Sequence, residues 1–157
     1  MNPATTIFPR AFLAIFWGGL ACGVLDISQA FIAWGLRGVK PVRILQSVAS
    51  GLIGPRSFQG GVSTALLGAG LHFFIAFVAA AVYYAASRKL TFLVEHFVLW
   101  GLIYGEAVFL FMNFVVLPLS AIHRVPTFTA AQIITGPIGH LFLVGLPIAL
   151  AVRRYSS

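Results

Sequence analysis

Four ionisable residues lie inside long apolar stretches of this 157-residue chain: Asp26, His72, Glu106 and His140. Each lies near the middle of its stretch, and Asn113 follows Glu106 by two helical turns on the same face. A charged side chain at the centre of a bilayer costs about 2.5–3.5 kcal/mol on insertion scales, so it faces the protein interior and finds a partner. We therefore predict that these residues form one polar cluster inside a membrane.

Two carboxylates and two imidazoles at one depth are suited to several kinds of chemistry. They can form a proton or cation path, in which Asp26 and Glu106 bind the proton or cation and the histidines relay it. All four can instead ligate zinc, iron or manganese, or His72 and His140 alone can ligate haem from two helices. The remaining alternative is polar pairing that only holds helices together in a structural or assembly subunit. The residue types leave these alternatives open, and the cofactor, if any, is unknown.

Enzymatic chemistry has less support in the sequence. The chain contains no Gly-x-Ser-x-Gly motif, no His-Glu-x-x-His motif and no phosphate-binding loop. Its single aspartate excludes an intramembrane protease with paired aspartates, and no Glu-x-x-His pair is present for a di-iron bundle. The sequence therefore favours a transporter or channel-like component over an enzyme.

The composition is that of an integral membrane protein. Hydrophobic residues make up 60% of the chain and charged residues only 8%, against roughly 25% charged residues in soluble domains. The ten basic residues outnumber the three acidic ones, but they lie between or beyond the apolar stretches. There they can contact anionic lipid headgroups, so we expect the lipid bilayer rather than nucleic acid as the partner. The composition also allows a homo-oligomer or a membrane complex.

Four apolar segments are long enough to span a membrane, since about 20 helical residues cross its hydrocarbon core. They cover residues 11–36, 61–86, 91–117 and 128–151. The short links between the later segments predict antiparallel neighbours. We therefore predict an all-α, up-down bundle of four transmembrane helices that forms a single membrane domain over residues 1–157.

The link after the first span has its own pattern over residues 41–54. Pro41 can begin a helix and Gly54-Pro55 can end it. Apolar residues share one face of that helix: Ile44, Leu45, Val48 and Leu52. Polar residues share the opposite face: Arg43, Gln46, Ser47 and Ser50. The segment is too short to span, so we predict an amphipathic helix in the membrane interface.

Small residues recur at helical spacing beside the polar residues. The glycines expected at helix contacts are Gly19, Gly23, Gly68, Gly101, Gly105 and Gly136. Membrane helices approach most closely at such residues. This pattern places the polar side chains on or beside contact faces, where they can converge.

Short motifs in the last 95 or so residues resemble the YagU-like family of small bacterial inner-membrane proteins. They are Leu71-His72-Phe73, Pro118-Leu119, Gly139-His140-Leu141 and the terminal Arg153-Arg154. The resemblance implies a multi-pass protein of the bacterial inner membrane, with no established chemistry. The compact, basic link after the first span departs from the longer polar segment expected in that family.

The orientation in the membrane is not decided by charge. Each side of the predicted bundle carries five basic residues, so the positive-inside rule favours neither. We expect cytoplasmic termini, because most basic residues on the other side belong to the amphipathic link and can bind lipid there.

Overall fold

The computed structural model describes residues 3–124 and 130–156, with side chains described over 10–124 and 135–156. Within these ranges the chain is helical and has no strand. The long helices and the connector are α1 (Pro3–Gly35), α2 (Pro41–Ile53), α3 (Gly61–Ser87), α5 (Phe97–Phe111), α7 (Ala130–Gly139) and α8 (Leu146–Ser156). Shorter elements join them: the 3-10 helix η1 (Gly54–Gln59), α4 (Phe92–Glu95), the π-helices η2 (Met112–Val116) and η3 (His140–Gly145), and α6 (Leu117–Leu119).

Four continuous helical stretches are long and apolar enough to cross a membrane, which confirms the predicted class. They cover Arg10–Gly35, Gly61–Ser87, Phe97–Leu119 and Thr135–Ser156. The third stretch begins later than predicted, because the backbone at His96 (φ −109°, ψ 45°) separates α4 from α5. The start predicted for the fourth span, residue 128, lies outside the described residues.

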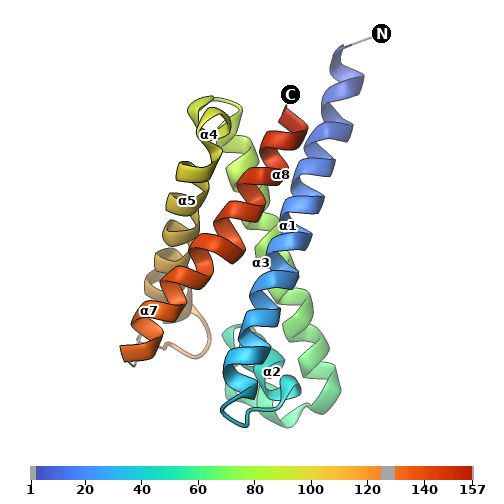
Figure 1. Cartoon of the computed structure of the whole chain (residues 1–157). Coiled ribbons are helices and arrows are strands. Elements are labelled where there is room, and N and C mark those ends of the chain that lie inside the picture. The colour runs from blue at the N-terminus through green and yellow to red at the C-terminus, as the bar shows by residue number, and fades with distance from the viewer. Residues whose placement is uncertain (1–2, 125–129, 157) are drawn as a thin grey trace.

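Both ends of the chain lie at the same end of the molecule, and α2 lies at the other (Figure 1). Helix α1 runs from the first end to the second, α3 returns, α5 descends again, and α7, η3 and α8 complete the path (Figure 1). Helix α1 packs against α3 and α8, while α5 packs against η3 and α8. Helix α2 packs against the start of α3.

The interior is built mainly from small residues, and large apolar side chains point outward. Ala14, Ala80 and Ala149 are fully buried. In contrast, Phe74 is 64% exposed and Leu119 is 79% exposed. This is the distribution expected where lipid rather than water surrounds the helices, because the outer face must then be apolar.

Two tyrosine hydroxyls donate hydrogen bonds to backbone carbonyls of neighbouring helices. Tyr83 is 1% exposed, and its hydroxyl donates to the Leu93 carbonyl at 2.9 Å. The Tyr104 hydroxyl donates to the Ala79 carbonyl at 2.7 Å, and the two rings lie 4.9 Å apart. These bonds join α3 to α4 and α5 at the end of the molecule that carries the termini.

Glycines mark the closest helix contacts. Gly101 and Gly105 on α5 face Gly145 at the end of η3, and a Cβ added at Gly105 would collide with the backbone carbonyl of His140. A Cβ at Gly68 would likewise collide with the Leu45 carbonyl on α2. The other predicted packing glycines lie against aromatic rings: Gly19 against Phe77, Gly23 against Phe73 and Gly136 against Phe109.

The face that α2 buries differs from the apolar face read from the sequence. Ile44 and Ala49 are buried together with Gln46 and Ser50, while Leu52 is 59% exposed. The Gln46 amide donates to the Gly61 carbonyl at 2.9 Å and lies 3.3 Å from the Thr64 hydroxyl. The start of α3 presents polar groups, so α2 turns polar side chains toward it.

We expect Gly105→Ala to destabilise the protein by about 1–3 kcal/mol, because the added methyl group forces α5 away from η3. Thermal unfolding in detergent, followed by circular dichroism, measures the change. Gly70→Ala is the matched control, since nothing lies within 4 Å of a Cβ added at Gly70. Equal melting temperatures for the two variants would contradict this account of the contact.

Candidate functional site

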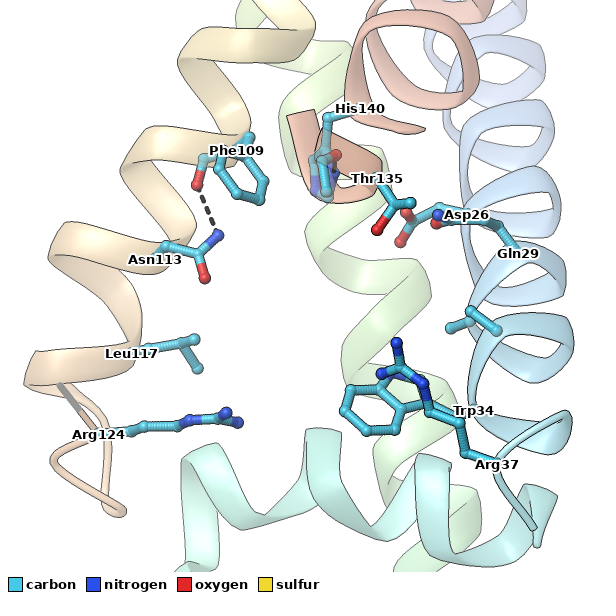
Figure 2. Close-up of a pocket in the computed structure, with 13 residues that line it drawn as sticks. Asp26, Gln29, Trp34, Arg37, Phe109, Asn113, Leu117, Arg124, Thr135 and His140 are labelled. Carbon is cyan, nitrogen blue, oxygen red and sulfur yellow. Dashed lines mark hydrogen bonds between the residues drawn. The ribbon is translucent and has the colours of Figure 1, made fainter. Parts of the chain in front are cut away.

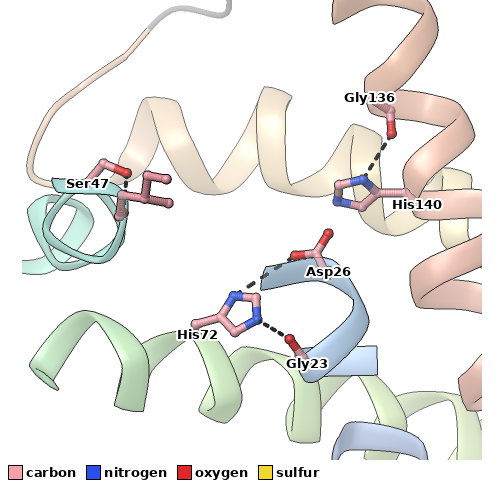
Figure 3. A network of polar contacts seen from close by, with 7 residues as sticks. Gly23, Asp26, Ser47, His72, Gly136 and His140 are labelled. Carbon is pink, nitrogen blue, oxygen red and sulfur yellow. Dashed lines mark hydrogen bonds and ion pairs between the residues drawn. The ribbon is translucent and has the colours of Figure 1, made fainter. Parts of the chain in front are cut away.

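The centre of the site is a pair formed by Asp26 on α1 and His72 on α3. The Nδ1 atom of His72 lies 4.0 Å from Oδ2 of Asp26, and the two side chains are 13% and 25% exposed, respectively. The Nε2 atom of the same imidazole lies 2.8 Å from the Gly23 carbonyl oxygen, one helical turn before Asp26 (Figure 3). Both ring nitrogens of His72 therefore face α1.

The Gly23 carbonyl determines where the proton of His72 lies. A carbonyl oxygen only accepts hydrogen bonds, so Nε2 must carry a hydrogen. The exchangeable position is then Nδ1, which faces the Asp26 carboxylate. Nδ1 and the Asp26 carboxylate are the two groups at this position that can accept a proton. The two groups therefore face each other across the contact between α1 and α3.

A cavity of about 310 Å³ lies next to Asp26, between α1, the end of α5 and the start of the last span. Its polar lining near Asp26 includes Gln29, Asn113 and His140. Figure 2 shows Asp26 and His140 at one end of the cavity and Arg37 and Arg124 at the other, close to α2. Asp26 therefore lies between the His72 imidazole and a space that leads toward the α2 end of the molecule.

His140 belongs to the same site through the cavity. Its Nδ1 lies 3.1 Å from the Gly136 carbonyl, so Nδ1 carries a hydrogen and Nε2 is the nitrogen able to accept a proton. Its ring meets the Phe109 ring edge to face at a centroid distance of 5.1 Å. In Figure 3 the Asp26 carboxylate lies between the imidazoles of His72 and His140.

Two π-helical turns supply cavity residues from the third and fourth spans. Asn113 lies in η2 and its amide donates to the Phe109 carbonyl at 2.9 Å, while His140 begins η3. Pro118 and Pro147 follow these two turns. Each proline ring crowds the carbonyl four residues earlier, which lies in the π turn, and a wider turn relieves that clash. The two prolines thus explain the π turns that direct the Asn113 and His140 side chains into the cavity.

Glu106 does not join the Asp26 site, although the sequence grouped the two carboxylates. It is absent from the lining of the cavity. Its Oε2 atom is buried and has no hydrogen-bond partner among the described residues. Asp26, Asn113 and His140 thus line one cavity and His72 pairs with Asp26, whereas Glu106, on α5, does not line that cavity.

The metal and haem alternatives find no support in this geometry. Over the part of the chain that the structure describes, no three His, Cys, Asp or Glu side chains gather in a group able to hold a metal ion. Both nitrogens of His72 are directed at α1 rather than at His140. A haem held between His72 and His140 would require the imidazole to leave both of these contacts.

Sequence reasoning did not identify the residues at the α2 end of the cavity. In the sequence, Arg37 and Arg124 are two of the ten basic residues that lie between or beyond the apolar stretches, and Trp34 lies near the end of the first stretch. Their spacing carries no signal, because they come from two distant loops and one helix end. The structure alone brings them to the same cavity.

Comparisons with known proteins give no relative for this chain. No protein-family model, no curated protein and no solved structure matches it. The resemblance to the YagU-like family therefore stays a prediction.

We expect Asp26 and His72 to be energetically coupled, because each supplies the partner that the other needs in an apolar surrounding. A double-mutant cycle with Asp26→Asn, His72→Gln and the double variant should give a coupling free energy of about 0.5–3 kcal/mol in detergent unfolding. Ser28→Ala, an exposed change on α1, serves as the control and should be additive with His72→Gln. Additive effects of Asp26→Asn and His72→Gln would show that the two side chains do not interact.

Proposed function

We propose that this chain is a multi-pass membrane protein that binds a proton at the Asp26–His72 pair and exchanges it through the adjoining cavity. In this account it is a proton-coupled transporter or channel-like component. The observation that carries the proposal is the position of Asp26, with an imidazole 4.0 Å away on one side and the cavity on the other. A group that only held helices together would not need access to such a space.

The depth of the pair supports a role in transfer across the bilayer. Asp26 and His72 lie within about 6 Å of the midpoints of their spans, at a rise of about 1.5 Å per residue. Ionisable side chains at this depth mark proton relays and substrate pathways in membrane proteins. A proton held here has about half of the membrane still to cross.

The chemistry favours a proton over a metal cation as the bound species. A divalent metal cation is usually held by several oxygen ligands that include more than one carboxylate, whereas Asp26 is the single carboxylate among the described residues that line the cavity. Imidazole and carboxylate exchange protons readily near neutral pH. His140 provides a second proton acceptor on the cavity side of Asp26, because its Nε2 is able to accept a proton.

In the membrane setting that we propose, the four spans form an up-down bundle and α2 lies in the headgroup region. We further propose the bacterial inner membrane as its location, on the resemblance of the short sequence motifs, and cytoplasmic termini, because most basic residues on the other side belong to the amphipathic link. The cavity then opens on the side opposite the cytoplasm, because Arg37 and Arg124 line it close to α2 (Figure 2), and α2 lies at the end of the molecule opposite the termini (Figure 1).

The second candidate is a structural or assembly subunit, and one observation favours it. The bond between His72 Nε2 and the Gly23 carbonyl joins α1 to α3 directly. Polar contacts of this kind hold membrane helices together, at about 0.6 kcal/mol on average. This candidate predicts that loss of the pair reduces stability without affecting any flux.

Proton flux into liposomes distinguishes the two candidates. We expect the reconstituted protein to acidify liposomes under an imposed potential, and Asp26→Asn to reduce that rate by about tenfold or more, because proton transfer by a positioned group contributes at least about 10²-fold. A pH-sensitive dye inside the vesicles reports the rate. Ser28→Ala should retain the wild-type rate.

Melting temperatures of the same preparations complete the test. A folded Asp26→Asn protein without flux supports the proposal. Wild-type protein that carries no more protons than empty liposomes, or Asp26→Asn protein with unchanged flux, would contradict it.

A further inference from the structure

The α2 end of the cavity has the features of an anion site. We propose that Arg37 and Arg124 together bind a phosphate or carboxylate group, with the apolar part of the same ligand inside the cavity. Arg37 comes from the turn after α1, and Arg124 from the segment that follows α6. Figure 2 shows their side chains on opposite sides of the cavity, both near its α2 end.

The charges at this end are unbalanced. The chain has three acidic residues, and Asp26 is the one among them that lines the cavity. It lies at the far end and is paired with His72. Among the described residues, neither arginine forms an ion pair with a carboxylate. Guanidinium groups without a protein counter-ion favour phosphate and carboxylate, whose oxygens match their donors.

Arg37 is held in place by its neighbours. Its guanidinium carbon lies 5.0 Å from the centroid of the Trp34 ring, which is within the range of a cation–π contact. Its backbone amide donates to the Trp34 carbonyl at 3.0 Å. The side chain is therefore preorganised beside the cavity rather than extended at random from a loop.

Helix α2 connects the segments that carry the two arginines. It begins four residues after Arg37, and near its other end the Gly51 carbonyl accepts a hydrogen bond of 2.9 Å from the Ala121 amide. Ala121 lies three residues before Arg124. One short helix thus fixes the separation between two loops that are distant in the sequence, which is what a two-point anion site requires.

The walls of the cavity define the rest of the ligand. Trp34, Phe109 and Leu117 supply aromatic and apolar surface, and Gln29 and Asn113 supply amide groups. The volume of about 310 Å³ is at the small end of ligand cavities, which span roughly 300–1,000 Å³. These features fit a small amphiphilic anion. A free organic acid and the headgroup of an anionic lipid share this chemistry.

The inference does not depend on the proposed proton transfer, because neither arginine belongs to the Asp26–His72 pair. Its test is a binding measurement on the full chain in detergent, followed by the quenching or shift of tryptophan fluorescence. The probes are hexanoate, with hexanamide as its neutral analogue, and phosphatidylglycerol, with phosphatidylcholine as its zwitterionic analogue. The variants are Arg37→Gln and Arg124→Gln. Arg56→Gln is the matched control, since Arg56 is exposed in η1 and does not line the cavity.

We expect one of the anionic probes to bind more tightly than its analogue, and each arginine variant to weaken that binding about fivefold or more, because each removes a charge-assisted contact. Arg56→Gln should bind as the wild type does. Binding of hexanoate identifies a free organic acid as the ligand class, whereas a response to phosphatidylglycerol alone identifies a lipid headgroup. Failure of both anionic probes, or equal losses in all three variants, would overturn the proposal.

Discussion

The hydrogen bond between the His72 imidazole and the Gly23 carbonyl, 2.8 Å long, determines the chemistry of the whole site. It requires α1 and α3 to approach closely, and Gly23 permits this because a Cβ there would lie 2.7 Å from the Phe73 ring. Because Nε2 of His72 donates to the Gly23 carbonyl, Nδ1 is the ring nitrogen that faces Asp26. Polar contacts of this kind between membrane helices contribute about 0.6 kcal/mol on average. The orientation of the His72 ring toward Asp26 follows from this one bond.

The sequence was sufficient to predict the helical membrane class and the polar residues at mid-membrane depth. An apolar segment that crosses the bilayer must be a helix, because its backbone groups have to bond within the segment. The hydropathy of the sequence therefore indicates the length of each helix and the depth of each residue along it. It does not report how each helix is rotated. Glu106 shares the depth of Asp26 but not its neighbours, and the buried face of α2 includes Gln46 rather than only apolar side chains. The rotation of each helix about its axis depends on how its side chains pack against other segments. The pattern of one segment alone carries no information on that packing.

The cavity depends on irregular backbone that periodicity cannot predict. Asn113 and His140 lie in π turns next to Pro118 and Pro147. Regular α-helix through these residues would rotate both side chains by part of a turn relative to α1. Prolines in membrane helices are tolerated where neighbouring helices satisfy the freed groups, and here the irregular turns also shape a space. The arginines at its α2 end join the site only through the fold, because α2 brings their two loops together.

Infrared difference spectroscopy of the Asp26 carboxyl group tests the central claim most directly. Spectra of the reconstituted protein across a pH change should contain a carboxyl band that disappears in Asp26→Asn and shifts in His72→Gln, because in the proposed function both side chains face the same proton-binding position. The band should remain unchanged in Glu106→Gln, since Glu106 lies outside the site. A carboxyl band that survives in Asp26→Asn, or one that His72→Gln leaves unaltered, would contradict a shared proton at this pair.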